Sequence, residues 1–475
     1  MDRKLTSNFI YNLIYQFLTI ALPVITIPYV SRVLGPSGIG EYNYVNSIVS
    51  YFGIVAVLGT VQYGQREISR AQFDVLERSK RFWKILFFRL TMTAIIFGAY
   101  TIFVCLIFHK YHALFIANYC TVLSWALDVS WYFQGVENFR VTAVRNAFVK
   151  IIATICIFVF VKNYSDLLLY TLIGSLSSML GNLTMIPFLR GQIKIIKVKI
   201  VEVIRVMSGS LVFFVPIVAI QIYNTLNKII LGTFSTTKEV GYYSQALQII
   251  SVANGIIYSL SAVLLPRLSY LFDQKKINKL KDVMFMGIQN VFLMGMPMTV
   301  GLVMVADIFV PIFFGNGYKP VIIILYILSL MFIIVGIGQL LGVYLLSINR
   351  QIYNTISVII AAFVNIFGIF LVMKIRGNAI DVSIVAVLTE LSTTIYQMLS
   401  IRDYLNIRVY ISAFVKYILP CLLMVISILL VRFTFRNSVA ELILSILVAV
   451  MVYFAYLFIK RDNFVISLLG TLRKK

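Results

Sequence analysis

IIATICIFVFV (Ile151–Val161) and LLMVISILLV (Leu422–Val431) are two of many nearly unbroken apolar runs in this sequence. Of its 475 residues, 60% are hydrophobic and 12% are charged, which is about half the charged fraction of an ordinary soluble domain. A soluble protein of this length cannot bury so much apolar surface, so the composition argues against a water-soluble enzyme and against a disordered chain. The runs also lack the alternation of membrane β-strands, and they therefore predict transmembrane helices.

The supply of apolar residues suits about fourteen such helices, because each needs about 20 residues to cross a bilayer. We expect an all-α polytopic membrane protein with spans at 9–33, 38–59, 83–108, 112–133, 146–162, 166–189, 208–232, 240–266, 284–312, 320–346, 355–373, 380–400, 413–431 and 438–459.

Positive charge is distributed unequally over the connectors between these spans. Of the 41 Lys and Arg residues, 27 fall on the side of the N-terminus and nine on the opposite side. By the positive-inside rule, this bias predicts that both termini are cytoplasmic. Most of the net charge of +23 then reflects the orientation of the chain in the membrane. Its counter-charge is expected to be anionic lipid headgroups rather than nucleic acid.

Short motifs recur at a nearly constant interval along the chain. Gly35 at the end of the first span matches Gly232, 197 residues later, and Gly40 matches Gly241 at an interval of 201 residues. The alternative is chance similarity among segments rich in Leu, Ile and Gly. If the repeat is real, the matching helices are six apart, and an even spacing gives both copies the same orientation in the membrane.

The repeat predicts three parts: an N-terminal six-helix lobe (1–207), a parallel C-terminal six-helix lobe (208–411), and helices 13 and 14 with a cytoplasmic tail (412–475). Two such lobes suggest a cavity between them, which rocking of the lobes would open to either side of the membrane in turn by alternating access. No connector exceeds about 23 residues, so we expect no soluble domain.

Charged residues inside the spans are candidate functional groups. Arg89, Asp128 and Lys150 are each expected about 6–9 Å from the cytoplasmic ends of their helices. We predict that they cluster, with Asp128 paired to one cation and one positive charge left over for an anionic substrate. The alternative is that Arg89 and Lys150 extend to the membrane interface. Glu390 lies mid-span and is a candidate for ion coupling, or else a neutral acid hydrogen-bonded within the helix bundle.

Polar side chains recur on single faces of four expected helices. Such faces should not contact lipid, so they are candidates for the wall of a cavity, with interhelical hydrogen bonding as the alternative. The candidates are Asn12, Gln16, Asn43, Asn46, Gln221, Asn224 and Gln248. No catalytic, nucleotide or metal motif accompanies them, so we expect no cofactor, no metal and no enzymatic activity.

Three motifs carry a resemblance to a known family. PYVSRVLGPSGIGEY (Pro28–Tyr42), YGQREIS (Tyr63–Ser69) and VGYYSQA (Val240–Ala246) resemble segments of bacterial polysaccharide repeat-unit flippases of the O-antigen, Wzx type. That family belongs to a superfamily that also contains multidrug antiporters and the lipid II flippase.

The resemblance implies movement of an undecaprenyl-pyrophosphate-linked oligosaccharide from the cytoplasmic to the outer leaflet of the bacterial inner membrane. Expected partners are this substrate and membrane lipids, with a polysaccharide polymerase and glycosyltransferases as further candidates and no nucleic acid. Two other classes remain open: a multidrug or cation antiporter of the same fold, and a membrane polysaccharide polymerase or ligase. The first would favour more carboxylates within the spans, and the second would need a sizeable outer loop.

Overall fold

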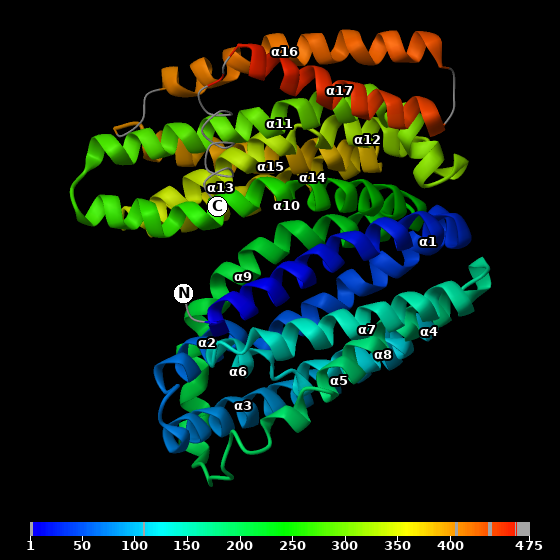
Figure 1. Cartoon of the computed structure of the whole chain (residues 1–475). Coiled ribbons are helices and arrows are strands. Elements are labelled where there is room, and N and C mark those ends of the chain that lie inside the picture. The colour runs from blue at the N-terminus through cyan, green and yellow to red at the C-terminus, as the bar shows by residue number, and fades with distance from the viewer. Residues whose placement is uncertain (1–2, 108–109, 404–406, 436–438, 461, 463–475) are drawn as a thin grey trace. The chain divides into compact units, whose positions relative to one another are not determined.

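The computed structural model describes residues 3–107, 110–403, 407–435, 439–460 and 462. Within its helices the side chains at 3–20, 107, 139–140, 215–217, 219–220, 222–224, 256, 258–263, 407 and 409 are not described. The described chain is helical, contains no strand, and forms two compact units, 1–241 and 242–475 (Figure 1). The expected three-part division at 207 and 411 stays a prediction.

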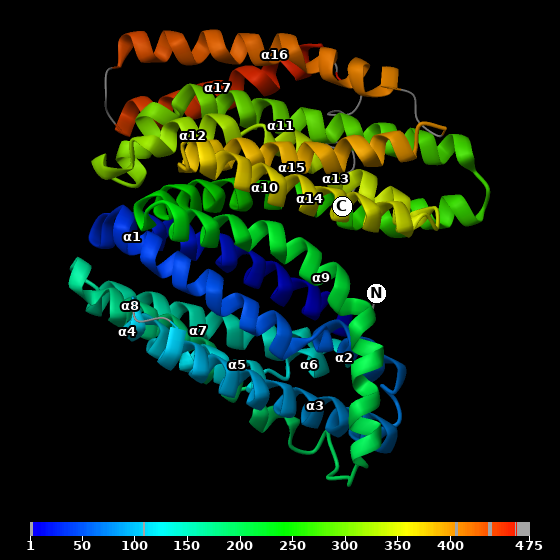
Figure 2. The ribbon, with the colours of Figure 1, turned by 180° about the vertical axis from the view of Figure 1, so that it is seen from behind.

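The first unit is built from helices that lie side by side in both views (Figures 1 and 2). Its elements are α1 (Arg3–Val57), α2 (Thr60–Arg70), α3 (Val75–Ile102), the π-helix η1 (Phe103–Ile107), α4 (His112–Ala117), α5 (Tyr119–Leu127), α6 (Ser130–Gly135), α7 (Phe139–Phe160), η2 (Tyr164–Asp166), α8 (Leu167–Leu183), η3 (Ile186–Leu189) and α9 (Ile200–Phe234). Helix α8 packs against α5 and α7, and α5 also packs against α3.

Helix α1 consists of two helices joined at Gly35. This residue has φ 66° and ψ 177°, a conformation that glycine adopts without steric cost and that interrupts the helical hydrogen bonds. The break falls in the connector expected between the first two spans. Close by, Gly40 lies so near the start of α10 that a Cβ atom added to it would be 1.6 Å from the carbonyl oxygen of Thr237. Glycine is therefore required for this helix crossing.

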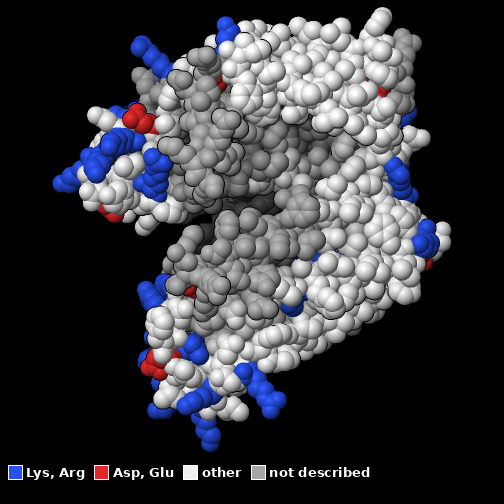
Figure 3. Space-filling view, in the orientation of Figure 1, with Lys and Arg blue, Asp and Glu red and all other residues white. Residues whose placement is uncertain are grey.

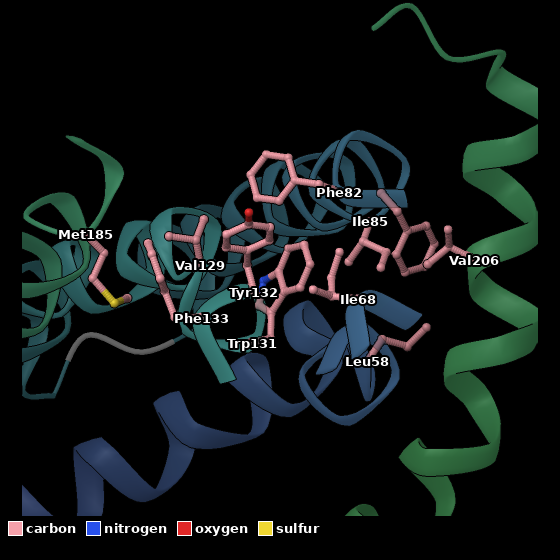
Figure 4. Close-up of a cluster of buried hydrophobic side chains, with 11 residues drawn as sticks. Leu58, Ile68, Phe82, Ile85, Val129, Trp131, Tyr132, Phe133, Met185 and Val206 are labelled. Carbon is pink, nitrogen blue, oxygen red and sulfur yellow. The ribbon is translucent and has the colours of Figure 1, made fainter. Parts of the chain in front are cut away.

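A buried aromatic cluster packs one end of the first unit together (Figure 4). Trp131, Tyr132 and Phe133 of α6 are fully buried, and Phe82 of α3 stacks on Trp131 with ring centroids 5.4 Å apart. Gly64 of α2 admits the Trp131 ring, because a Cβ atom there would be 2.6 Å from it. The short helix α6 is thus fixed between α2 and α3, and the chain on either side of it is fixed with it.

The second unit contains the longer helices of the C-terminal half. Helix α10 (Thr237–Asp273) begins at the boundary between the units. It is followed by α11 (Ile277–Phe313), η4 (Asn316–Tyr318), α12 (Pro320–Leu328), α13 (Met331–Ser347), α14 (Gln351–Ile375), α15 (Ala379–Ser400), α16 (Ile407–Thr434) and α17 (Val439–Ile459). Helices α16 and α17 pack against each other and against α11.

The chain is a polytopic membrane protein with two lobes. Eleven helical segments of the described chain are long and apolar enough to cross a membrane, and one of them, Ala21–Arg70, contains the break at Gly35. The number fourteen stays a prediction. At one end of the first unit, Lys and Arg side chains gather around the α2–α3 connector and the segment before α9, while the helical flank shows few charges (Figure 3). This distribution suits helices that cross a bilayer.

Candidate functional site

The first unit holds two adjoining cavities with polar walls. The larger has a volume of about 720 Å³ and is called here the cationic cavity; its polar lining residues are Ser124, Asp128, Ser130, Gln134, Thr142, Arg145, Asn146, Lys150, Ser177, Ser178 and Asn182. The smaller has a volume of about 450 Å³ and is called here the neutral cavity; its polar and aromatic lining residues are Tyr42, Asn46, Ser50, Asn118, Thr121, Trp125, Thr171, Ser175, Ser178 and Gln221.

The two cavities are neighbours, because Gly174 and Ser178 of α8 line both. The second unit offers a contrast. Its cavity of about 420 Å³ lies between α10, α11, α13, α16 and α17 and is lined mostly by apolar side chains. Ser445 and Tyr453 add hydroxyl groups, and none of its described lining residues is charged. Among the cavities described, those with charged side chains in their walls therefore lie in the first unit.

Asp128 forms the expected ion pair, and its partner is Arg89. The Arg89 guanidinium donates from Nη2 to Asp128 Oδ2 at 2.9 Å and from Nε to the carbonyl oxygen of Trp125 at 2.6 Å. The second carboxylate oxygen of Asp128 accepts from the backbone N–H of Ser130 at 2.9 Å. Asp128 thus ends α5 and begins the turn into α6 while it faces the cationic cavity.

Arg89 itself does not line the cavity. Its side chain is 1% exposed, against 19% for Asp128. A guanidinium buried this deeply in α3 needs a counter-charge, and Asp128 supplies it. The pair fixes α3 to the end of α5. A direct contact between Arg89 and a substrate stays a prediction, and the described geometry favours a positioning role for this residue.

Among its described lining residues, the cationic cavity has two basic side chains, and both come from α7. Lys150 was expected there, and it is exposed. Arg145 was not expected, because the sequence placed it in a connector, whereas α7 begins at Phe139 and carries Arg145 into the cavity wall. The Arg145 guanidinium donates to the side-chain oxygens of Asn146 and Asn182 and to the carbonyl oxygen of Gly181. These three acceptors are uncharged amide and carbonyl oxygens, and they set the orientation of the guanidinium.

The polar faces expected on the helices are only partly brought together in these cavities. Asn46 and Gln221 line the neutral cavity, while Asn43 donates to the carbonyl oxygen of Ile39 within its own helix at 2.8 Å. Gln248, on α10, is exposed and belongs to the second unit. The side chains of Asn12, Gln16 and Asn224 lie outside the described residues. Substrate roles for this whole set stay predictions.

Glu390 is half-buried on α15, one residue after the fully buried Thr389. Two neighbouring hydroxyl groups take part in the packing of the helix bundle: Thr393 donates to the carbonyl oxygen of Thr389 at 3.4 Å, and Thr394 donates to that of Ile334 at 3.0 Å. A role of Glu390 in ion coupling stays a prediction.

A charged network joins α2, α3 and α9 at the basic end of the first unit. Arg81 bridges Glu67 at 3.0 Å and Glu77 at 2.9 Å, and Glu202 accepts from Lys80 and Lys84, each at 3.1 Å. Hydrogen bonds from Lys84 and Lys80 lower the pKa of the Glu202 carboxyl from its ordinary value to about 2. The network therefore connects the first turn of α9 to α3 at every physiological pH.

Sequence comparisons place the chain in a family of polysaccharide biosynthesis proteins. The family profile described as "Polysaccharide biosynthesis protein" matches residues 5–272. A protein of Escherichia coli (strain K12) named "Putative O-antigen transporter" is 23% identical over 409 residues, which cover 84% of this chain and 97% of the relative. A protein of the same name from Shigella dysenteriae is 21% identical over 309 residues, covering 62% of this chain and 74% of the relative.

Solved structures show the same fold. The lipid II flippase MurJ in an inward closed conformation has a TM-score of 0.77 at 16% identity, covering 96% of this chain and 99% of that chain. An inward-facing multidrug resistance transporter of the MATE family, in the MOP superfamily, has a TM-score of 0.59 at 13% identity, covering 82% of this chain and 95% of that chain. At these identities the likeness concerns the fold alone.

Proposed function

The chain belongs to the polysaccharide biosynthesis protein family, and from this premise we propose that it translocates a lipid-linked oligosaccharide across the bacterial inner membrane. The movement is from the cytoplasmic to the outer leaflet. The substrate class is an undecaprenyl-pyrophosphate-linked repeat unit of a surface polysaccharide. Both curated relatives carry the name of an O-antigen transporter, which supports this assignment.

The observation that carries the proposal is the cationic cavity. Its lining contains Arg145 and Lys150 against Asp128, and Asp128 is already paired with the buried Arg89. Basic side chains therefore outnumber carboxylates in the described lining of this cavity, and charged groups within a membrane protein are ordinarily functional. A pyrophosphate is an anion that guanidinium and ammonium groups bind well. The lipid tail stays in the bilayer, and no covalent step is required.

Movement would follow alternating access, in which a path for the substrate opens to each side of the membrane in turn. The two compact units supply the parts that such a mechanism needs. In this arrangement both termini are cytoplasmic, as the distribution of Lys and Arg predicts. The polymerase and the glycosyltransferases of the same polysaccharide are the proposed functional partners, since one consumes and the others supply the substrate.

A multidrug or cation antiporter would need a carboxylate that exchanges protons or ions within the cavity. Asp128 is poorly suited, because one oxygen is held by Arg89 at 2.9 Å and the other by the Ser130 N–H at 2.9 Å. Ion exchange at Asp128 would have to break a buried ion pair. Among the described residues of the two cavities, Asp128 is the sole carboxylate, which favours the flippase over the antiporter.

The proposal is tested by deleting the gene and measuring lipid-linked repeat units in each leaflet. Deletion should trap these units in the cytoplasmic leaflet, and the intact gene should restore export. Lys150→Gln should reduce export at unchanged protein abundance, whereas Lys110→Gln, which removes an exposed cation outside both cavities, should not. Unchanged export after deletion would contradict the flippase assignment.

A further inference from the structure

The neutral cavity differs chemically from its neighbour. Its described lining contains no Asp, Glu, Lys or Arg, although amide and hydroxyl groups surround it. Two aromatic side chains, Tyr42 and Trp125, contribute to the wall. The volume of about 450 Å³ lies within the range of about 300–1,000 Å³ that small-molecule sites occupy. The cavity is thus polar, uncharged and partly aromatic.

Two contacts hold Trp125 in a defined place, one at its own carbonyl oxygen and one between its ring and Gly53. Its carbonyl oxygen accepts from Arg89 Nε at 2.6 Å, so the ion pair that supports the cationic cavity also fixes α5 at this residue. The benzene part of its indole lies against Gly53 of α1, where a Cβ atom would be 2.5 Å from the ring. The glycine therefore permits the indole to occupy the space between α1 and α5.

Hydrogen-bond donors in this wall are left for a ligand. In the described part of the chain, neither the indole N–H of Trp125 nor the amide nitrogen of Gln221 has a protein acceptor; the Gln221 side-chain oxygen accepts from Thr225 at 3.4 Å. Both side chains are partly exposed. Fixed donors beside an aromatic ring suit a pyranose, whose hydroxyl groups accept hydrogen bonds and whose C–H face packs on an aromatic ring.

We propose that the neutral cavity is a binding site for an uncharged sugar residue, packed on Trp125 and hydrogen-bonded by Gln221. Its identification as the glycan subsite of the transported substrate rests on the proposed function. The pyrophosphate then lies in the cationic cavity, and the two sites are joined at Gly174 and Ser178. A uronic acid is disfavoured in the neutral cavity, because its carboxylate would lose water without gaining a cationic partner.

The test uses the full chain in nanodiscs and two soluble probes, methyl glucoside and inorganic pyrophosphate. Saturation-transfer NMR with methyl glucoside should show binding to the wild type, and glucuronate should bind at least about tenfold more weakly. Trp125→Leu should weaken methyl glucoside binding about tenfold, while Trp125→Phe, which keeps an aromatic face, should retain most of it. Calorimetry should show the opposite dependence for pyrophosphate: Lys150→Gln should lose pyrophosphate binding, and Trp125→Leu should retain it.

A matched control is Trp83→Leu, which changes a second tryptophan of the first unit outside both cavities and should leave sugar binding unchanged. The proposal is overturned if the wild type binds no methyl glucoside, if glucuronate binds equally well, or if Trp125→Leu binds the sugar like the wild type. Export in the deletion strain is a separate readout. If sugar binding depends on Trp125 but deletion of the gene leaves export intact, the flippase assignment is refuted and the sugar site stands.

Discussion

The ion pair between Arg89 and Asp128 permits a double-mutant test of how the first unit supports its cavity. The perturbations are Arg89→Met, Asp128→Asn and the two together. Methionine keeps an unbranched chain of similar length without the charge, and asparagine keeps the shape of Asp128 without the carboxylate. Each single variant leaves one partner behind, and the double variant leaves neither.

The two single variants should differ in cost, because the partners differ in burial. Asp128→Asn leaves a guanidinium that is 1% exposed, with the Trp125 carbonyl as its main acceptor, and Arg89 Nη1 already has no partner. Removing one partner of such a buried pair costs about 3–5 kcal/mol. Arg89→Met leaves a carboxylate that borders the cavity and keeps the Ser130 N–H, so we expect about 1–3 kcal/mol. The double variant should cost less than the sum of the two.

The measurement is the free energy of unfolding of the purified protein in mixed micelles, with denaturing detergent as the perturbant. Coupling between the two sites, calculated from the four proteins, should be at least about 1 kcal/mol. Additive effects of the two substitutions would refute the reasoning. So would an Asp128→Asn variant that is as stable as the wild type, because a buried guanidinium without its counter-charge would then carry no cost.

Three further predictions concern other parts of the chain. Gly40→Ala should destabilise the protein by about 1–3 kcal/mol or more, since the new Cβ atom would meet the Thr237 carbonyl oxygen at 1.6 Å; an unchanged unfolding free energy would show that the crossing can open. Glu390→Gln should lower export if Glu390 couples transport to an ion, and equal export rates over a range of pH in both proteins would exclude that role. Hydrogen bonds from Lys84 and Lys80 lower the pKa of Glu202 to about 2. This pairing therefore stabilises the fold fully above a pH of about 4.5, and the stabilisation is lost as the pH falls toward 2. Glu202→Gln should therefore reduce the acid dependence of unfolding, and an identical acid profile in both proteins would contradict the assignment.

Much of the fold could be predicted from hydropathy, because a membrane helix must be apolar over about 20 residues. The break at Gly35 was also visible as a short connector that contains Gly and Pro. The spans that hydropathy predicts from 83, 146 and 208 begin about seven or eight residues after α3, α7 and α9 themselves begin. In each case the helix begins before the apolar segment, in a stretch that carries charged residues. Hydropathy detects the part of a helix that meets lipid, while backbone hydrogen bonding extends it further.

The candidate site was predictable where a residue's chemistry conflicts with its surroundings. Asp128 and Lys150 stood out as charges within apolar spans, and both line the cationic cavity. Arg145 was missed because the start of its helix was missed. Trp125 gave no signal in a sequence with 14% aromatic residues, since an aromatic side chain on a membrane helix is ordinarily a packing residue. Its place in a cavity wall depends on Gly53, on a different helix, and such a pairing appears only in three dimensions.

A charged residue can stand out within a transmembrane span and still be unavailable to a substrate, as Arg89 shows. By its position in an apolar helix, Arg89 appeared as functional as Lys150, yet its charge is engaged by Asp128 beneath the cavity wall. The cost of burying that guanidinium is offset only if the carboxylate stays in place, and the carboxylate in turn fixes the turn from α5 to α6. Arg145 donates to neutral amide and carbonyl oxygens, which set the orientation of its guanidinium in the cavity wall. The proposed binding of an anionic headgroup therefore assigns two separate tasks: the buried pair of Arg89 and Asp128 supports the cavity wall, and the basic side chains of α7 that line the cavity contact the substrate.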